Sequence, residues 1–247
     1  MMTGMRHTLA QLGWQNAILY WLGRALDKGS AGRWTLHRYH FIAQYVGDTP
    51  LTPPRGRDID IRPQTASDPL PGDYPRPPAV VRDRYVQGAL SLTAWRGGRL
   101  AGFLWLIADA YQEDEVRARY RLASSRASWD FDVWVRPEER LGWVFGRLWE
   151  AARQHLRRHD VRWTCSRISA FNPASLRAHA QIGTVLLGGA LFLRCGAWQW
   201  MVASLAPYVH LSRSPASFPQ LMFDTSALAD IAPQEQPCPI SIKSARS

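Results

Sequence analysis

Proline divides this chain of 247 residues into stretches that differ in their capacity for regular structure. Nine of the seventeen prolines lie between Pro50 and Pro78, and six lie from Pro207 onward. Proline lacks an amide donor and fixes its own φ angle, so such stretches resist the interiors of helices and sheets. The pattern predicts four segments, namely an N-terminal helix–strand extension (1–48), a linker that includes the first core strand (49–78), a main domain (57–206) and an irregular tail (207–247).

The composition indicates a globular chain with a basic surface. Apolar residues make up 46% and aromatic residues 11%, enough to bury a sizeable core and to exclude wholesale disorder. The formal net charge is +10, and all basic residues except Lys28 and Lys243 are arginine. Such a charge favours an anionic partner. Nucleic acid is not expected, because the arginines are not interleaved with aromatics in an RNA-binding motif.

The cysteines point to a reducing compartment. Cys165, Cys195 and Cys238 are odd in number, and no pair has the spacing of metal ligands, so we expect neither a disulfide framework nor a metal site. The N-terminus has no pattern of a secretory signal, and no run reaches the roughly 18 apolar residues that a membrane span needs. We therefore expect no transmembrane segment and a cytoplasmic location.

Apolar periodicity predicts a first helix at 8–27. Two roles are open for it, a membrane-surface anchor or a helix packed on the main domain. Packing is favoured, because an anchor usually carries a dense basic face and only Arg24 and Lys28 are present. Whether this helix and the strand predicted at 34–46 close an acceptor pocket or form a homodimer contact also stays open.

From residue 57 onward, strand and helix patterns alternate. Strands are predicted from period-two patterns and a Gly97-Gly98 turn, and helices from the 3.6-residue period. The predicted strands are 59–61, 89–95, 100–107, 127–135, 161–168, 184–193 and 196–204, and the predicted helices are 143–159 and 173–182. This order predicts an α/β (α+β) fold with a mixed, mostly antiparallel central sheet flanked by helices.

Two segments carry the strongest functional signals. Residues 133–156, VWVRPEERLGWVFGRLWEAARQHL, form a strand, a short turn and a long helix. Because a helix N-terminus presents unpaired amides and a positive dipole end, this order suits a phosphate. In residues 172–183, NPASLRAHAQIG, Asn172 is a predicted N-cap and Pro173 occupies the first helical position.

Together these segments resemble the GCN5-related N-acetyltransferase (GNAT) superfamily, over roughly residues 57–204. The stretch IDIRPQTASD is similar to that family's first strand and turn, and VRPEERLG to the V-x-P-x-x-R start of its acetyl-CoA loop. Four residues fall on the family's N-x-x-S-x-x-x-Y-x-x-x-G pattern: Asn172, Ser175, His179 and Gly183. The resemblance implies an acyl-CoA N-acyltransferase-like fold.

The loop departs from the family's R-G-x-G-x-G/A pattern. Arg140 is kept, but three bulky residues replace the small ones: Leu141, Trp143 and Phe145. Small residues there let backbone amides approach a pyrophosphate, so the cradle must be reshaped, with Gly142 and Gly146 able to supply a shifted turn. His179 replaces the family's tyrosine.

The resemblance also implies an activity and its binding residues. An amine acceptor, either a small molecule or a protein, attacks the thioester of acetyl-CoA or another acyl-CoA directly, without a metal. Backbone contacts to the donor are assigned to Trp134, Val135 and Arg136. The donor's remaining contacts are assigned to Arg140, Leu141, Gly142, Trp143, Gly146, Asn172 and Ser175. Two alternatives stay open, an acyl carrier protein as the donor and a non-catalytic acyl-CoA-binding or scaffolding module.

Proton transfer is assigned to three side chains. Asp130 and Asp132, at i and i+2 of one strand face, are close enough to raise one another's pKa for a base, or they pair with arginines instead. His179 lies one turn after Ser175 and can donate a proton to the leaving thiolate. Three acidic residues attract a cationic acceptor or form a solvated loop: Glu113, Asp114 and Glu115.

Overall fold

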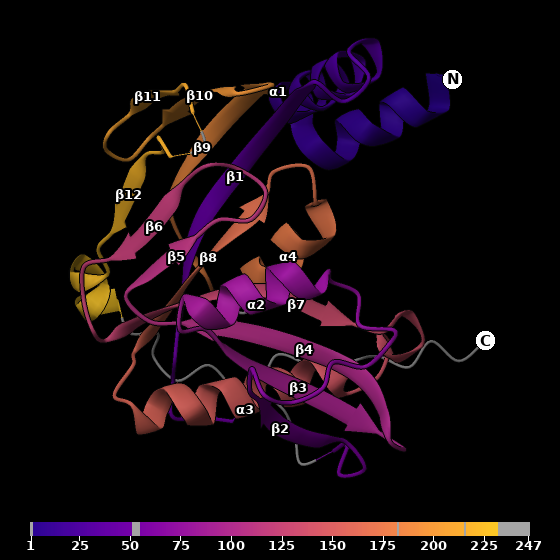
Figure 1. Ribbon diagram of the computed structural model, residues 1–247, viewed down its shortest axis with the longest axis vertical. Coiled ribbons are helices and arrows are strands. Elements are labelled where there is room, and N and C mark those ends of the chain that lie inside the picture. The colour runs from indigo at the N-terminus through magenta and orange to yellow at the C-terminus, as the bar shows by residue number, and fades with distance from the viewer. Residues whose placement is uncertain (1, 51–54, 182, 215, 232–247) are drawn as a thin grey trace. The chain divides into compact units, whose positions relative to one another are not determined.

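The computed structural model describes residues 2–50, 55–181, 183–214 and 216–231. The chain divides into two compact units, each assembled from separate stretches of sequence (Figure 1). Unit 1 comprises Met1–Gln44, Ala110–Ala123 and Cys165–Asp224; unit 2 comprises Tyr45–Asp109, Ser124–Thr164 and Thr225–Ser247. Cys238, and the end of the predicted tail from residue 232 onward, lie outside the described residues. Over the described ranges, no helix is both long and apolar enough to cross a membrane.

Unit 1 is built on long antiparallel pairing between strands that are distant in sequence. Its larger sheet has the order β11 (Val209–Ser212), β10 (Trp198–Ala203), β9 (Val185–Cys195), β1 (Trp34–Tyr45) and β8 (Trp163–Ser169). The pairing of β1 with β9 runs from Trp34 opposite Cys195 to Ala43 opposite Val185. A second sheet has the order β12 (Gln220–Phe223), β6 (Arg119–Leu122) and β5 (Ala110–Gln112), in which β12 and β6 are parallel.

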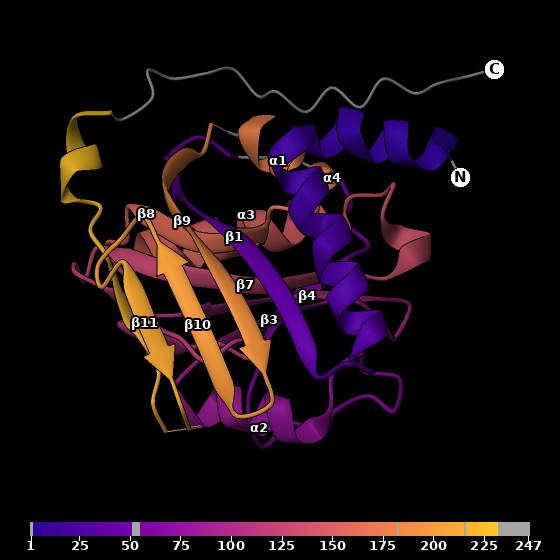
Figure 2. The same cartoon turned by 90° about the horizontal axis from the view of Figure 1, so that it is seen from above.

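Helix α1 (Met2–Gly29) lies along one face of this larger sheet, beside β1 (Figure 2). A Cβ atom placed on Gly23 would lie only 3.4 Å from the Leu36 Cβ, so the helix approaches the strand closely there. Gly13 interrupts the helix with a φ of 71°, a conformation that glycine adopts without the Cβ penalty of other residues. The short helix α4 (Pro173–Gln181) also belongs to unit 1.

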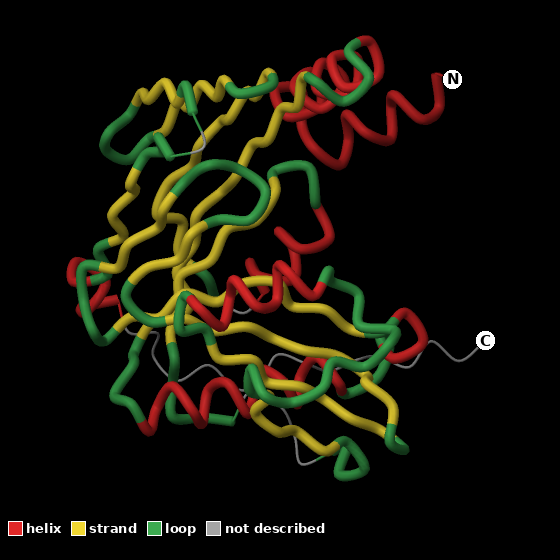
Figure 3. The backbone as a smooth tube through the Cα atoms, viewed as in Figure 1, coloured by secondary structure: helices red, strands yellow, loops and turns green. Residues whose placement is uncertain are grey.

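Unit 2 is an antiparallel sheet with helices. Its strands follow the order β7 (Ala127–Val135), β4 (Arg99–Ile107), β3 (Leu90–Arg96) and β2 (Asp60–Gln64). Helix α3 (Val144–Arg158) packs against β4 and β3, and together they enclose a core that includes Leu104, Val144 and Leu148. Helix α2 (Pro78–Val86), the 3-10 helix η1 (Pro137–Glu139) and the 3-10 helix η2 (Ser226–Ile231) complete the unit (Figure 3).

The predicted class, α/β with a mostly antiparallel sheet and flanking helices, is confirmed. Two segments contain elements that the sequence did not predict. The segment 207–247, predicted to be mostly irregular, contains β11, β12 and η2 among its described residues. The proline-rich linker ends in α2, whose first residue is Pro78, a position where the missing amide has no intrahelical partner to lose. The short strands β5 and β6 were not predicted. The four segments drawn from the proline pattern stay a prediction.

Candidate functional site

Strand β7 contains a bulge at Asp132. Its register with β4 shifts by one residue, since Phe103 pairs with Trp134 whereas Trp105 pairs with Phe131. Asp132 is one of two residues opposite a single residue of β4, and its φ of 48° is left-handed. A bulge of this kind bends the strand and leaves backbone polar groups outside the ladder.

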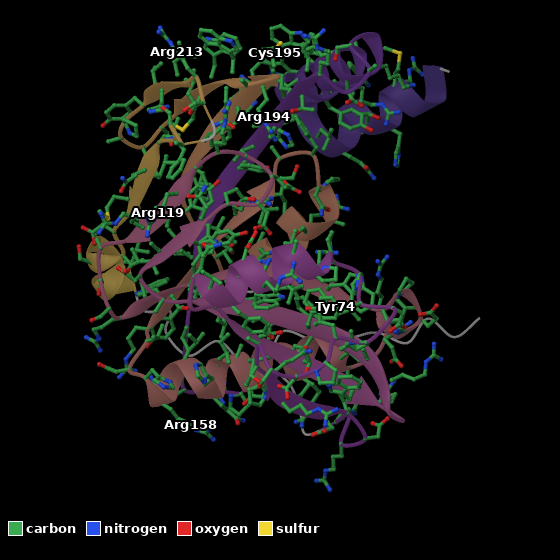
Figure 4. All side chains as sticks on the ribbon, in the orientation of Figure 1. Tyr74, Arg119, Arg158, Arg194, Cys195 and Arg213 are labelled. Carbon is green, nitrogen blue, oxygen red and sulfur yellow. The ribbon has the colours of Figure 1, made fainter. Side chains whose placement is uncertain are left out.

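The bulge changes which side chains share a face. Trp134 stacks on Phe103 at 5.6 Å between ring centroids, and Phe131 stacks on Trp105 at 6.1 Å, so all four rings lie on one face. Tyr74, labelled in Figure 4, stacks on Phe103 at 4.9 Å on the same face, and burial raises the pKa of its hydroxyl to about 12. The strict alternation predicted for 127–135 therefore ends at the bulge.

Asp130 and Asp132 lie on opposite faces of β7. Asp130 is buried and pairs across the ladder with Leu106, a residue of the core beneath α3. Asp132 instead accepts hydrogen bonds from Arg76 Nε at 2.7 Å and Arg84 Nη1 at 2.5 Å. The prediction that the two carboxylates share a face is thus wrong. Pairing with arginines, the alternative that the sequence left open, describes Asp132.

The Asp132 carboxylate is the counterion of the buried Arg84 guanidinium. Its side chain is only 4% exposed, and its guanidinium lies over the rings of Trp105 and Phe131 at 5.3 Å and 5.2 Å. A buried cation without a counterion is costly, and Asp132 supplies that counterion. Arg84 was not among the predicted site residues, because α2 itself was not predicted.

The turn after β7 is held by arginines. Arg136 Nε donates to the Leu100 carbonyl at 2.7 Å, and Arg140 Nε donates to the Val135 carbonyl at 3.3 Å. The Gly142 amide donates to the Glu139 carbonyl at 3.0 Å, and the Glu139 carboxylate pairs with Arg96. The turn thus has its own hydrogen bonds, with the exposed Arg140 just before α3.

The N-terminus of α3 has no side-chain cap. Trp143 occupies the N-cap position without a capping hydrogen bond, and the first intrahelical bond runs from the Arg147 amide to the Trp143 carbonyl at 2.8 Å. The amides of the first turn, including those of Phe145 and Gly146, therefore lack intrahelical acceptors. Backbone amides and guanidinium groups are the kinds of donor that bind phosphates in proteins.

The three bulky side chains of this turn differ in how they pack. The Trp143 ring packs against the unit 2 core, with the Arg55 guanidinium 5.4 Å from its centroid. The Phe145 ring lies 6.2 Å from that of Trp149. Leu141 is almost fully exposed. Two of the three bulky side chains thus have packing partners within unit 2.

Helix α4 begins as predicted. Asn172 Oδ1 accepts a hydrogen bond from the Ser175 amide at 3.1 Å, which confirms the N-cap. His179 Nδ1 lies 2.8 Å from the Ser175 carbonyl and 3.4 Å from the Ser175 hydroxyl. Because a carbonyl only accepts, Nδ1 carries the proton and Nε2 has the free lone pair. Burial lowers the pKa of His179 below its ordinary value of 6.5, so the neutral ring is set to accept a proton rather than to donate one.

The acidic segment after β5 contributes to a buried cluster in unit 1. The Glu113 side chain is 0% exposed and accepts two hydrogen bonds from Arg167, at 2.8 Å from Nε and 2.7 Å from Nη2. Arg167 also contacts Glu115 at 3.0 Å, and the Tyr39 hydroxyl donates to Glu115 at 2.7 Å. Asp114 and Glu115 are exposed. The prediction of a solvated loop is wrong for Glu113, whose carboxylate is engaged by Arg167.

Four partly buried histidines should make the protein less stable in mild acid. Burial lowers the pKa values of His37, His40, His155 and His179 below 6.5. Below pH 6.5 the unfolded chain binds protons that the folded chain does not. The free energy of unfolding therefore has its full value above pH 6.5 and falls as the pH drops toward the lowered pKa values. Urea unfolding between pH 7.5 and about 5.5 measures this slope. His179→Gln should reduce it, and an unchanged slope in that variant would contradict the assignment.

Comparison with known proteins gives a likeness of fold only. No family model matches the chain, and no curated protein is similar to it. Similar solved structures include a functionally unknown conserved protein from Staphylococcus epidermidis (13% identity, TM-score 0.46, 69% of this chain and 66% of that chain). They also include a tandem GNAT protein from the clavulanic acid biosynthesis pathway (15%, 0.42, 68% and 54%) and a GNAT-family protein from Novosphingobium aromaticivorans (12%, 0.40, 65% and 65%). The chain spans less than two thirds of the length of each of these three structures. Proteins of the GNAT fold are thus among those that this chain resembles in structure.

Proposed function

We propose that this chain is an N-acyltransferase that moves an acyl group from an acyl-CoA thioester to an amine. The observation that carries the proposal is the segment from β7 to α3, where a bulged strand leads through a short turn to a helix without an N-terminal cap. These are the same residues that carry the V-x-P-x-x-R resemblance. The bulge supplies backbone groups outside the ladder, and the helix end supplies donors for a diphosphate.

In this proposal the turn and the helix end hold the phosphates of the donor. The first-turn amides of α3 and the Arg140 guanidinium are the diphosphate donors. The resemblance assigns the pantetheine arm to the backbone of Trp134, Val135 and Arg136, as an added strand would use it. Of these, the Arg136 amide already donates to the Ala101 carbonyl, so Val135 is the residue whose amide is proposed to face the arm. Asn172 and Ser175 are assigned to the same donor by their motif.

The proposed chemistry requires an unprotonated amine and a stabilised oxyanion. His179 Nε2 accepts the proton as the amine nitrogen bonds to the acyl carbon, and the proton then passes to sulfur as the C–S bond breaks. The sequence motif alone assigns His179 to this reaction. A backbone amide at the β7 bulge donates to the developing oxyanion, a contact typically worth about 3 kcal/mol of barrier. Asp132 takes no part in proton transfer, since its carboxylate neutralises Arg84.

A second candidate, a non-catalytic acyl-CoA-binding module, is favoured by two observations. The carboxylate assigned as a base is paired with arginines, and bulky residues fill the positions of small ones in the turn. Both candidates require CoA binding and differ in turnover.

The test measures binding and turnover separately. Calorimetry with CoA should show binding that Arg140→Gln weakens at least about tenfold, the value of a charge-assisted hydrogen bond. Arg158→Gln, at the opposite end of α3, is the matched control and should bind CoA normally. Release of free thiol from acetyl-CoA and longer acyl-CoAs, with a panel of amines, should fall about a hundredfold or more in His179→Phe.

Three outcomes separate the candidates. CoA binding without thiol release from any acyl-CoA would support the non-catalytic module. Thiol release only from an acylated carrier protein would assign the donor to that class. Absence of CoA binding, or equal binding by wild type and Arg140→Gln, would contradict both candidates.

A further inference from the structure

One face of the larger sheet of unit 1 carries apolar side chains that are open to solvent. Along β10 the side chains of Trp198, Trp200 and Val202 are exposed, whereas those of Gln199 and Met201 between them are buried. Figure 2 shows β11, β10, β9 and β1 side by side in this sheet, with α1 next to β1. Exposed apolar side chains gathered on one face mark an interaction surface rather than chance exposure.

Indole rings form a ladder on this face. The Trp34 ring stacks on that of Trp200 at 6.1 Å with 2° between their planes, and the Trp198 ring stacks on Trp200 at 6.2 Å with 18°. The Arg213 guanidinium, labelled in Figure 4, lies 5.4 Å from the centroid of the Trp198 ring. Val209, opposite Val202 on β11, is 68% exposed and extends the face.

Helix α1 adds a second exposed apolar stripe. Its packed side includes Ala17, which is fully buried, and Tyr20, whose ring contacts Phe171. Trp14, Ile18 and Leu22 recur every fourth residue and are nevertheless exposed, Trp14 by 65%. Because residues four apart lie on one side of a helix, α1 presents apolar side chains both toward unit 1 and away from it.

The charge of these elements is strongly one-sided. Residues 2–44 and 185–213, which contain α1, β1, β9, β10 and β11, include one acidic residue, Asp27. The same two stretches include seven basic residues: Arg6, Arg24, Lys28, Arg33, Arg38, Arg194 and Arg213. Of these, Arg194 lies opposite the buried Gln199, on the other side of the sheet from the exposed indoles, and donates to the Glu115 carbonyl. A second copy of the chain would bring like charges together, whereas an anionic surface would attract them.

We infer that this face, formed by the indole ladder of β1 and β10 together with the α1 stripe, binds the surface of an anionic lipid bilayer. Tryptophan is the side chain that prefers the headgroup level, since its ring is apolar and its N–H is polar. Basic side chains beside such rings add attraction to anionic headgroups. The occupant that matches both the indoles and the charge is therefore a membrane surface, and this inference is independent of the proposed acyl transfer.

The first test compares vesicles that differ in charge. The full chain should sediment with vesicles of phosphatidylcholine and phosphatidylglycerol, and at least about tenfold more weakly with phosphatidylcholine alone. Added salt should weaken the first interaction, and brominated lipids should quench tryptophan fluorescence. Equal binding to both kinds of vesicle, or binding to neither, would overturn the inference.

Matched variants locate the contact. Trp198→Ser with Val202→Ser removes part of the β10 face, and Trp14→Ser with Ile18→Ser removes part of the α1 stripe. Each pair should weaken binding at least about tenfold, from the apolar surface lost. The control, Val86→Ser in unit 2, changes an 87% exposed side chain and should bind like wild type. Circular dichroism confirms that each variant is folded.

A further measurement tests the competing occupant. If wild type forms a dimer without lipid and the Trp14 and Trp198 variants are monomers, the face belongs to a second copy and the inference is overturned. The inference is also overturned if these variants bind anionic vesicles as tightly as wild type. A chain that is monomeric without lipid and loses vesicle binding in both variants supports it.

Discussion

Arg167→Met should reduce the free energy of unfolding by about 3–5 kcal/mol, the typical cost of removing one partner from a buried ion pair. The reason is Glu113, which stays fully buried while losing both of its hydrogen bonds from the guanidinium. Glu115 and Tyr39 keep their mutual hydrogen bond, so the loss concerns the buried carboxylate. Urea unfolding of wild type and variant at pH 7.5 measures the difference.

The pH dependence identifies the cause. Burial raises the pKa of the Glu113 carboxyl above its ordinary 4.5, and Arg167 opposes that rise. Without Arg167, the folded state holds a proton that the unfolded state has already lost, so the variant gains stability relative to wild type as the pH falls toward 4.5. The control is the double variant Glu113→Leu, Arg167→Met, which should recover most of the loss. A deficit that is the same at every pH, or a double variant less stable than the single one, would contradict this account.

Asp132→Asn should cost about 3 kcal/mol of unfolding free energy, because it leaves the Arg84 guanidinium buried without its carboxylate. Asparagine tolerates the left-handed φ of 48° about as well as aspartate does, so this substitution isolates the charge. Asp132→Ala should cost about 1–2 kcal/mol more, from the Cβ strain of that conformation. Thermal and urea unfolding of the two variants measure both contributions.

The same substitution separates a structural role from a catalytic one. Arg84→Met, Asp132→Asn also removes the cation that the Asp132 carboxylate neutralises, and it should recover stability relative to Asp132→Asn alone. In the catalytic hypothesis drawn from the sequence, Asp132→Asn would be folded and as stable as wild type but inactive. A stable and inactive variant would therefore restore Asp132 as the base.

The turn and helices of the main domain could be predicted from the sequence because the patterns that specify them are local. The Gly97-Gly98 turn joins β3 and β4 as predicted, and the helices α3 and α4 begin within one residue of their predicted starts. Helix α2 was missed because two prolines at its start were read as a linker, although proline fits the first turn of a helix. The short strands β5 and β6 have too few residues to show a period.

The candidate site was only partly predictable. The N-cap at Asn172 and the contact between Ser175 and His179 follow from spacing along one helix. The face on which Asp132 lies could not be predicted in this way. A single bulged residue moves every later side chain to the other face, and the alternation of apolar residues does not reveal the bulge. Arg167 lies on β8 and Glu113 in the segment after β5, so only the folded topology brings them together.

The pairing of β1 with β9 has a consequence for synthesis of the chain. All four sheet strands of unit 2, and α3, are synthesised before the first residue of β9. During that interval β1, with Phe41 and Ile42 destined for the core, has no β9 to pair with, and an unpaired apolar strand is prone to aggregation. The pairing of β1 with β9 can therefore be completed only after β9 has been translated, and until then the nascent β1 exposes an apolar segment that can aggregate.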